Sequence, residues 1–496
     1  MSDREGSGDG SDGSDGSDGG EAGATSIKLF GIHMTARTVG FLGLVYFARM
    51  LPGDRLGIYF LFFVVVQVGS MLSNLGIGQA LVQRIGEGRN ESRVFSAATA
   101  IMLAVSLVVA ALALAFRGPL ASYVGADVAV LAAVTVAAWL LADVHIRTLQ
   151  GEDRVLLSGG LQLLQDVVRV GSGALLITAG FGPRGLMYGV LAGFVVTVVV
   201  GYVLVEASLT LPTREDFETV LGISRYTMVY GPTNFVYFWL DTALIGLFLL
   251  PLDVSAYEVA WQTVRVLIIA TTAINQTIFP KVSEWASQGR FDEIERVLPG
   301  ALVFSLVFPL PGLVGVAVLG GDVLAQVYRP EYRYAALAMT ILATYMAVES
   351  LQRVVNSTLT GMDRADLPFR SRLIGVGLAV VLNLALIPEF ELLGAAVGTL
   401  LAKTVDTAIQ YRGLAGLIEL RVPVRSLAWQ AVSALLMGGV VYAGATTTSL
   451  PDSTLGVAVL VAAGVAVYGG LALLDRDIRQ VVEQYSPVPI PVPRLG

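Results

Sequence analysis

Cysteine is absent from this sequence, and charge is scarce. Without cysteine among its 496 residues, the chain has no disulfide framework, no thiolate metal site and no cysteine nucleophile. Two histidines, His33 and His145, leave little for a zinc site or a histidine-based catalytic triad. Charged residues make up 14% of the chain, against about 25% in a soluble domain. We therefore expect no metal site, no cofactor and no nucleic acid partner.

Long apolar runs take up most of the chain. Hydrophobic residues make up 55% of it and the mean hydropathy is +0.71, so we predict an all-α polytopic membrane protein. A membrane-spanning helix needs about 20 apolar residues. Fourteen ranges are candidate spans: 27–51, 56–83, 94–116, 124–146, 155–180, 184–206, 224–250, 254–280, 298–320, 334–360, 370–388, 391–412, 427–447 and 453–474. The short connections leave no room for a sizeable soluble domain, so we do not expect an enzyme.

Charge is distributed unevenly along the chain. Residues 1–24 hold seven acids against Arg4 in repeated Ser-Asp-Gly units, a composition that predicts a disordered acidic tail. Cytoplasmic loops of membrane proteins carry an excess of lysine and arginine. With the N-terminus in the cytoplasm, the cytoplasmic loops and tails carry 22 of the 32 basic residues, and the opposite loops carry five. This split predicts that both termini are cytoplasmic (N-in, C-in).

The apolar region contains an internal repeat. Residues 51–54 (LPGD) match 250–253 (LPLD), residues 148–154 (TLQGEDR) match 358–364 (TLTGMDR), and residues 182–189 match the turn before 392–398. Spans 1–6 therefore correspond to spans 7–12. Because six is even, both copies have the same orientation, which predicts a parallel repeat about an axis along the membrane normal. We expect two six-helix lobes with a cleft between them, and two extra C-terminal helices.

These features divide the chain into five expected parts. They are an acidic tail (1–24), an N-lobe of spans 1–6 (25–210), a C-lobe of spans 7–12 (211–412), spans 13 and 14 (413–475) and a cytoplasmic tail (476–496). We expect a multi-pass monomer in the cytoplasmic membrane.

Several stretches carry a resemblance to a known family. They are residues 40–85, which include LGIY (56–59) and SNLG (73–76), residues 239–246 (WLDTALIG), residues 274–285 (INQTIFPKVSEW) and residues 361–402. The last of these is the most specific. Over residues 27–475 the chain resembles the multidrug/oligosaccharidyl-lipid/polysaccharide (MOP) exporter superfamily, and within it the polysaccharide (Wzx-type) flippases.

The resemblance implies a fourteen-helix, two-lobe carrier. Such a carrier flips lipid-linked oligosaccharide, on a polyprenyl or dolichyl phosphate, to the outer leaflet by alternating access, for polysaccharide or glycoprotein glycan assembly. Its implied partners are that lipid-linked oligosaccharide and membrane lipid, with Na⁺ or H⁺ as candidate coupling ions. Two alternatives stay open: a cation-coupled, MATE-like drug or metabolite exporter, and a non-transporting scaffold of a glycan assembly complex.

A lipid-linked glycan brings an anionic phosphate into the carrier. Arginine suits this group because its planar fork pairs with phosphate oxygens. Arg37 on span 1 and Arg265 on span 8 lie near the middle of their spans, in helices that the resemblance places along the cleft. We predict that these two arginines bind the phosphate in the central cleft. The alternative is that a structural acid neutralises each of them.

Other polar residues of spans 7 and 8 complete the predicted substrate-binding site. Glu258 and Gln262 share one helical face with Arg265. Asn275 closes span 8 and either hydrogen-bonds sugar hydroxyls or satisfies the end of the helix. A charge at mid-membrane depth is costly and is normally paired or functional. Asp241 on span 7 has no partner within a turn of its own helix, so it is either the mate of Arg265 or a carboxylate that couples transport to a cation.

Four further pairs of opposite charge have the spacing of contacts within one helix. They are Asp143 with Arg147, Asp166 with Arg169, Glu349 with Arg353, and Lys403 with Asp406. Residues three or four apart are neighbours on a helix surface. We interpret these pairs as structural.

Overall fold

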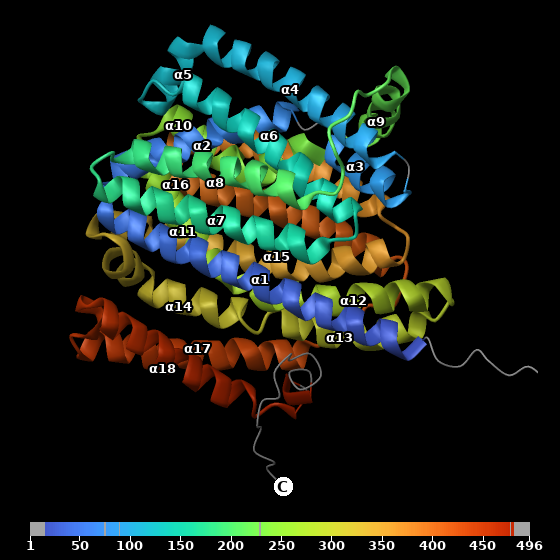
Figure 1. Cartoon of the computed structure of the whole chain (residues 1–496). Helices are drawn as coiled ribbons and strands as arrows, with labels where there is room; N and C mark the ends of the chain where they lie inside the picture. Colours follow the sequence, from blue (N-terminus) through green and yellow to red (C-terminus); the bar gives the residue numbers. More distant parts are fainter. Residues whose placement is uncertain (1–14, 74–75, 89, 228–229, 477, 481–496) are drawn as a thin grey trace, which may run out of the picture. The chain divides into compact units, whose positions relative to one another are not determined.

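The computed structural model is helical, and it describes residues 15–73, 76–88, 90–227, 230–476 and 478–480 (Figure 1). Side chains are described in these ranges except at 15–24, 26, 27, 72, 73, 223–227, 230–237, 270 and 273–277. Contacts divide the chain into two units. Unit 1 comprises Met1–Gly43, Leu72–Ala115 and Val130–Met228, and unit 2 comprises Leu44–Met71, Phe116–Ala129 and Val229–Gly496. The lobe boundaries expected from the repeat stay a prediction.

Unit 1 is built from closely packed helices. They are most of α1 (Asp15–Met50), α3 (Ile77–Gly86), α4 (Glu91–Ala115), most of α6 (Ala129–Gly151), α7 (Val155–Thr178), α8 (Pro183–Leu204) and α9 (Arg214–Thr227). α7 and α8 lie side by side and antiparallel (Figure 1). A Cβ at Gly189 would lie 2.7 Å from the Arg169 carbonyl oxygen, and one at Gly193 would lie 2.9 Å from that of Gln165. Glycine therefore lets the two backbones approach, as at many membrane helix interfaces.

Unit 2 contains the remaining helices. They are α2 (Gly53–Ser73), α5 (Arg117–Val124), α10 (Tyr230–Phe248), α11 (Pro251–Val264), α12 (Ile269–Ser287), α13 (Phe291–Ser305), α14 (Pro309–Asp322), α15 (Ala336–Gly361), α16 (Asp366–Ala415), α17 (Val424–Thr447) and α18 (Thr454–Ala472). One apolar cluster joins α12, α13, α15 and α16, with Val282, Leu298 and Leu359 among its buried members. A second joins α14, α17 and α18 through Leu319, Met437 and Leu460.

α16 is two helical arms joined by a sharp reversal rather than one rod. Glu391 has φ 52° and ψ −129°, which interrupts the helix three residues after Pro388. The Asn383 side chain donates to Thr399 Oγ1 at 3.3 Å, although sixteen residues of straight helix would span about 24 Å. The two arms therefore lie side by side, as the separate predicted spans 370–388 and 391–412 require.

Within the described residues each predicted span overlaps a helix, and three spans that we expected to be continuous are interrupted there. Span 56–83 ends as α2 at Ser73 and resumes as α3 after Gly76, whose φ is 75°. Span 254–280 contains a 3-10 turn, Arg265–Ile268, between α11 and α12. Span 298–320 breaks before Pro309, because proline has no N–H to continue the preceding helix. Hydropathy does not register such breaks, since the chain stays apolar through them.

The repeated LPGD and LPLD motifs pack against each other in unit 2. A Cβ at Gly57 would lie 1.7 Å from the Pro251 carbonyl oxygen, so only glycine fits there. The predicted spans 224–250 and 254–280 leave residues 251–253 as a connection, but Pro251 begins α11, and Asp253 accepts the Leu250 N–H at 3.1 Å as a helix cap.

The other repeated motif forms the same turn in each unit. After α6, the Arg154 N–H donates to the Leu149 carbonyl at 2.9 Å, and after α15 the Arg364 N–H donates to the Leu359 carbonyl at 2.9 Å. The residues before these arginines, Asp153 and Asp363, have φ values of 58° and 59°. The sequence repeat is therefore also a repeat of backbone geometry.

The C-terminal helices α17 and α18 lie outside the repeat, side by side in Figure 1. Arg49, at the end of α1, connects the repeat to them. Its guanidinium donates to the carbonyls of Gln326 and Val327 at 2.7 and 2.8 Å, and to Thr454 Oγ1 of α18 at 2.9 Å. Thr454 in turn donates to the Gln326 carbonyl at 2.8 Å.

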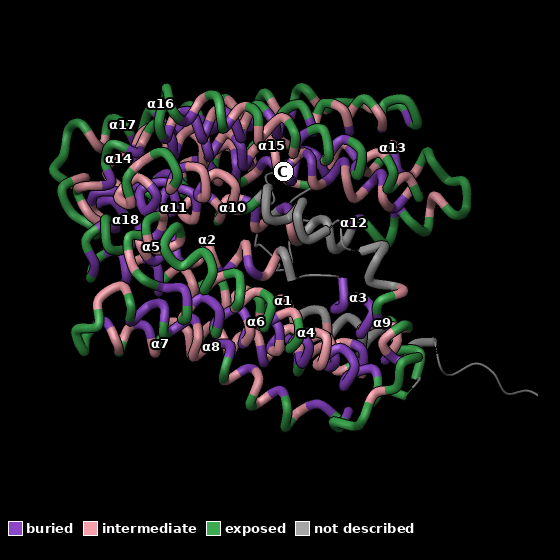
Figure 2. The backbone as a smooth tube through the Cα atoms, turned by 90° about the horizontal axis from the view of Figure 1, so that it is seen from above, coloured by how far each residue is buried: buried purple, intermediate pink, exposed green. Residues whose placement is uncertain are grey.

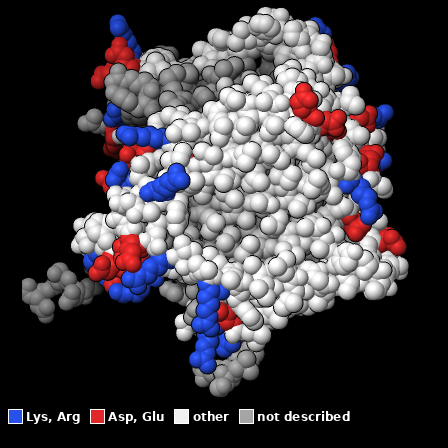
Figure 3. Space-filling view, turned by 180° about the vertical axis from the view of Figure 1, so that it is seen from behind, with Lys and Arg blue, Asp and Glu red and all other residues white. Residues whose placement is uncertain are grey.

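The surface is that of a membrane protein. Ten helical stretches of the described residues are long and apolar enough to cross a membrane. Large apolar side chains such as Leu107, Val203 and Leu435 are exposed, and Figure 2 shows exposed residues along the outer edge of α16 and α17. On the face drawn in Figure 3, charged side chains gather toward the edges of a broad uncharged surface. The chain is a multi-pass integral membrane protein, and the count of fourteen crossings stays a prediction.

Candidate functional site

Asp241 of α10 is held by neutral groups from α11 and both arms of α16. Its Oδ2 accepts from the Tyr257 hydroxyl at 2.7 Å, and its Oδ1 accepts from Asn383 Nδ2 at 2.7 Å and from Thr399 Oγ1 at 2.8 Å. Within the described residues, these three are the hydrogen-bonding partners of Asp241, and Arg265 is not among them. The carboxylate therefore sits in a ring of oxygen and amide groups rather than in an ion pair.

Glu258, Gln262 and Arg265 lie together, as their helical spacing predicts. Glu258 is 1% exposed, accepts a short hydrogen bond from the Thr242 hydroxyl of α10, and accepts one from Gln262 Nε2 at 3.4 Å. Arg265 begins the 3-10 turn after α11, and its guanidinium lies 5.7 Å from the centre of the Phe238 ring. It also interacts electrostatically with Glu258. This cluster adjoins Asp241, because Thr242 follows Asp241 on α10.

The two remaining predicted site residues stand apart from this cluster. Arg37 is exposed on α1 in unit 1, and no side-chain partner is found for it among the described residues. Its pairing with Arg265 of unit 2 stays a prediction. Asn275 lies in α12, but its side chain is outside the described residues.

Unit 1 contains a pocket that our sequence analysis did not predict. It has a volume of about 240 Å³ and lies among α6, α7 and α8. Its lining residues are Trp139, Ala142, Asp143, Ile146, Arg147, Gln150, Gln162, Gln165 and Phe194. The Trp139 and Phe194 rings stack at 5.6 Å with an interplanar angle of 9°. Most of the lining is therefore polar, with one aromatic wall.

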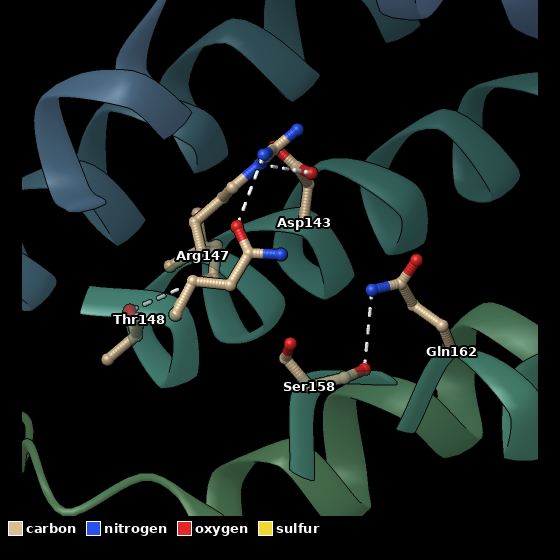
Figure 4. A network of polar contacts seen from close by, with 7 residues as sticks. Asp143, Arg147, Thr148, Ser158 and Gln162 are labelled. Carbon is tan, nitrogen blue, oxygen red and sulfur yellow. Dashed lines mark hydrogen bonds and ion pairs between the residues drawn. The ribbon is translucent and has the colours of Figure 1, made fainter. Parts of the chain in front are cut away.

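The polar groups of this pocket use only part of their hydrogen-bonding capacity within the described residues. Arg147 Nε donates to Asp143 Oδ1 and its Nη1 donates to Gln150 Oε1, both at 3.3 Å (Figure 4). Gln162 Nε2 donates to the Ser158 carbonyl at 3.3 Å. Gln165 Oε1 accepts from the Thr197 hydroxyl at 3.1 Å. Among the described residues, one end of each of the three glutamine amides has no hydrogen-bonding partner.

A group of side chains with similar spacing lies in unit 2. Trp139, Asp143 and Arg147 on α6 have the spacing of Tyr345, Glu349 and Arg353 on α15, but the second group lies about one helical turn farther from the repeated turn motif. Gly185 and Gly189 of α8 both approach α7 closely, as Gly394 and Gly398 approach the first arm of α16. With these glycines as the register, Phe194 of α8 corresponds to Lys403 of α16.

In the second repeat the lysine pairs with the acid. Lys403 Nζ lies in short contact with Glu349 Oε2, Arg353 Nε lies 2.7 Å from Glu349 Oε1, and the Lys403 ammonium lies 5.7 Å from the Tyr345 ring. Helical spacing predicted the pairs Asp143–Arg147, Asp166–Arg169 and Glu349–Arg353, which are confirmed. It did not predict the Lys403–Glu349 pair, because that contact joins two helices. The sequence does show an aromatic residue one turn before each acid, Trp139 before Asp143 and Tyr345 before Glu349, and this pattern was the available sign that the two pairs resemble each other.

The sequence also matches known proteins. Residues 46–337 match the model of a family described as polysaccharide biosynthesis protein. A "probable low-salt glycan biosynthesis flippase Agl15" of Haloferax volcanii is 29% identical over 92% of this chain and 96% of its own length. A "probable flippase AglR" of the same organism is also 29% identical, over 92% of this chain and 96% of its own length.

Solved structures share the fold at low identity. A lipid II flippase MurJ in an inward closed conformation superposes with a TM-score of 0.74, at 14% identity, over 91% of this chain and 98% of its own length. An inward-facing MATE family multidrug transporter of the MOP superfamily superposes with a TM-score of 0.61, at 14% identity, over 78% of this chain and 96% of its own. The chain therefore has the fold of these transporters.

Proposed function

Because the chain belongs to the polysaccharide biosynthesis protein family, we propose that it is a flippase that moves lipid-linked oligosaccharide across the cytoplasmic membrane. The near full-length similarity to a probable glycan biosynthesis flippase carries this proposal. Buried polar clusters inside an apolar helical fold support it, since a carrier for a polar head group needs polar surface away from lipid. We propose further that the protein is a monomer without enzymatic activity. It would cross the membrane fourteen times and have both termini in the cytoplasm.

In this proposal Arg37 and Arg265 bind the phosphate of the lipid carrier. Arg37 is exposed on a membrane-spanning helix, and Arg265 lies where α11 gives way to a 3-10 turn. Such an interruption inside a helix is often a hinge. Bending of the helix at this turn would move a phosphate that Arg265 binds. Substrate binding would thereby be linked to alternating access. An inside-negative membrane potential favours outward movement of the anion by about 2.3 kcal/mol per charge per 100 mV.

Asp241 is the proposed coupling carboxylate. Three neutral donors stabilise its charge, and no guanidinium or ammonium group is among its hydrogen-bonding partners in the part of the chain that the structure describes. Oxygen ligands suit hard cations, and a carboxylate also accepts a proton. Na⁺ or H⁺ binding at Asp241 would change the packing of α10 against both arms of α16.

The test is a leaflet-accessibility assay of a labelled lipid-linked oligosaccharide in vesicles that contain the purified chain. We expect flipping by the intact protein and at least a tenfold slower rate for Arg265→Ala and Arg37→Ala. Arg214→Ala is the matched control, because the Arg214 side chain is 93% exposed on α9. Asp241→Asn should remove any acceleration by a Na⁺ or H⁺ gradient. Failure of the intact protein to flip the lipid under any gradient would overturn the proposed function.

A further inference from the structure

We propose that the pocket of unit 1 is a separate sugar-binding site that takes one neutral sugar ring. The inference rests on the proposed function, because it assigns the pocket to the glycan of the flipped lipid. It places sugar recognition among α6, α7 and α8, all within unit 1. The arginines proposed for the phosphate lie elsewhere.

The size of the pocket limits the ligand. Its volume of about 240 Å³ is well above that of a single-water cavity. It is below the roughly 300–1,000 Å³ of pockets that take drug-sized ligands. One sugar ring fits this range, whereas an oligosaccharide does not. The remainder of a glycan would have to extend out of the pocket.

The charges of the pocket favour a neutral ligand. Asp143 and Arg147 form an ion pair and cancel each other, and the three glutamines are neutral. A phosphate or a uronate would meet the Asp143 carboxylate next to the guanidinium that attracts it. A neutral sugar meets no such repulsion, so the lining discriminates against anions.

The available hydrogen-bonding groups match hydroxyls. A sugar hydroxyl both donates and accepts, so it needs donors and acceptors side by side. The amide nitrogens of Gln150 and Gln165 are donors, and the Gln162 amide oxygen is an acceptor, without partners among the described residues. Asp143 Oδ2 adds a second acceptor. These groups come from two helices, α6 and α7.

Trp139 supplies the apolar wall that a sugar ring also needs. One face of a pyranose exposes C–H groups, and these pack on the electron-rich face of an aromatic ring. Phe194 stacks on Trp139 at 5.6 Å and is itself 7% exposed, so it fixes the plane of the tryptophan ring. The pocket thus combines one aromatic wall with polar groups around it.

Unit 2 shows how a similar group of side chains is filled from within the chain. There the position of Phe194 is taken by Lys403, whose ammonium group pairs with Glu349 and approaches the Tyr345 ring. The chain's own cation therefore satisfies the acid and the aromatic ring of the second copy. In unit 1 Asp143 pairs with Arg147, no lysine is among the described residues that line the pocket, and the space beside the pair is open.

The test uses the full chain in detergent and measures sugar binding without transport. Free glucose, mannose, galactose and N-acetylglucosamine are titrated, with glucuronate and inorganic phosphate as anionic comparators. Binding is read from tryptophan emission as the difference between the intact chain and Trp139→Phe. We expect at least one neutral sugar to bind with millimolar affinity, and the two anions to bind at least tenfold more weakly.

Two variants and one control establish the location. Phe194→Lys copies the second repeat, and we expect its ammonium to pair with Asp143 and weaken binding at least tenfold. Gln162→Leu keeps the fold of α7 and should weaken binding at least threefold, which covers the case in which Phe194→Lys does not fold. Gln288→Leu makes the same change at an exposed glutamine of unit 2 and should leave binding unchanged.

Absence of binding by every neutral sugar, tighter binding of an anion, or unchanged binding in Gln162→Leu would overturn the inference. These results are independent of the flipping assay. A chain that flips lipid-linked oligosaccharide but binds no sugar at Trp139 keeps the proposed function and loses the site. A chain that binds sugar but flips nothing keeps the site as a sugar-binding pocket and loses the proposed function.

Discussion

Each copy of the repeat holds a similar group of side chains, which is open in unit 1 and filled in unit 2. In unit 1 an aromatic residue, an acid, an arginine and a phenylalanine surround a pocket, and the acid and arginine are each about one-third exposed. In unit 2 the phenylalanine is replaced by Lys403, which is 4% exposed and pairs with the acid. The two groups lie about one helical turn apart in the repeat, so they are similar rather than equivalent. The comparison shows that an internal cation fills the group in unit 2, whereas the group in unit 1 leaves a pocket of about 240 Å³.

We expect the largest loss of stability when the buried ion pair of Lys403 and Glu349, which fills the group in unit 2, is broken. Glu349→Gln leaves Lys403 buried without its carboxylate, and removal of one partner of a buried ion pair costs about 3–5 kcal/mol. Asp143→Asn in the open copy should cost only about 0–1 kcal/mol, because that pair is partly exposed. Thermal unfolding of the purified variants measures both.

The double variant Glu349→Gln with Lys403→Met is the control for the first prediction. It removes both charges, so much of the lost stability should return. If Glu349→Gln and Asp143→Asn lower the melting temperature equally, the distinction between a filled and an open copy is wrong.

The next effect tests whether the repeated turns are packed alike. A Cβ at Gly151 would lie 2.8 Å from Ile85 Cβ of α3, and one at Gly361 would lie 2.9 Å from Val282 Cγ1 of α12. Gly151→Ala and Gly361→Ala should therefore each destabilise by about 1–3 kcal/mol, the usual cost of overpacking. Gly160→Ala is the control, because nothing lies within 4 Å of its added Cβ and alanine favours helix.

A smaller effect tests the left-handed residue of each turn. Alanine in the left-handed region costs about 1–2 kcal/mol, which aspartate and glycine partly or wholly avoid. Asp153→Ala and Asp363→Ala should therefore destabilise by about 1 kcal/mol each, and the two glycine variants should stay within about 0.5 kcal/mol of the parent. Denaturation midpoints that differ between the two turns would contradict their equivalence.

The smallest effect concerns the one residue at which the two turns differ in charge. Glu152, whose counterpart is Met362, accepts the N–H groups of Glu206 and Ala207 at 3.0 and 3.1 Å. Burial raises the pKa of Glu152, more than these hydrogen bonds and the Arg154 charge lower it. The contribution of Glu152 to the free energy of unfolding is therefore complete below the pKa that this carboxyl has in the unfolded chain. It declines as the pH rises through the higher pKa of the carboxyl in the folded chain.

Glu152→Gln separates the hydrogen bonds from the charge. The amide oxygen keeps both backbone contacts and does not titrate, so the variant should lose this decline. Melting temperatures of parent and variant between about pH 4 and 8 measure it. Met362→Leu, in the turn without a carboxyl, should leave the pH profile unchanged. A variant whose profile matches that of the parent would show that Glu152 has no part in it.

Features set by local periodicity were predictable from sequence. The helix positions and three of the four predicted ion pairs follow from spacing along one helix, and the repeat follows from matching motifs. The predicted pair of Lys403 with Asp406 stays a prediction. Glu258, Gln262 and Arg265 were grouped correctly because of their spacing along one helix. The partners of Asp241 were not, because Asn383 and Thr399 reach it only after the reversal of α16.

The pocket of unit 1 and the filled group around Glu349 and Lys403 in unit 2 could not be predicted from the sequence. Asp143 and Arg147 were interpreted as a structural pair, and the pairing itself is confirmed. What surrounds the pair depends on α8, whose register against α7 is set by the close approach of Gly189. Such contacts join residues about 50 positions apart, and neither hydropathy nor helical spacing encodes them. The breaks at Gly76 and Arg265 were not predicted, because the hydropathy of an apolar stretch does not depend on its backbone dihedral angles.

The hydrogen bonds of Arg49 have a consequence for truncation of the chain. One guanidinium joins the end of α1 to α18 through Thr454 and to the carbonyls of Gln326 and Val327. A chain that ends before α17 lacks Thr454, so its Arg49 keeps only the two carbonyls. Removal of the two C-terminal helices should therefore also loosen the end of the first helix, 405 residues before Thr454 in the sequence.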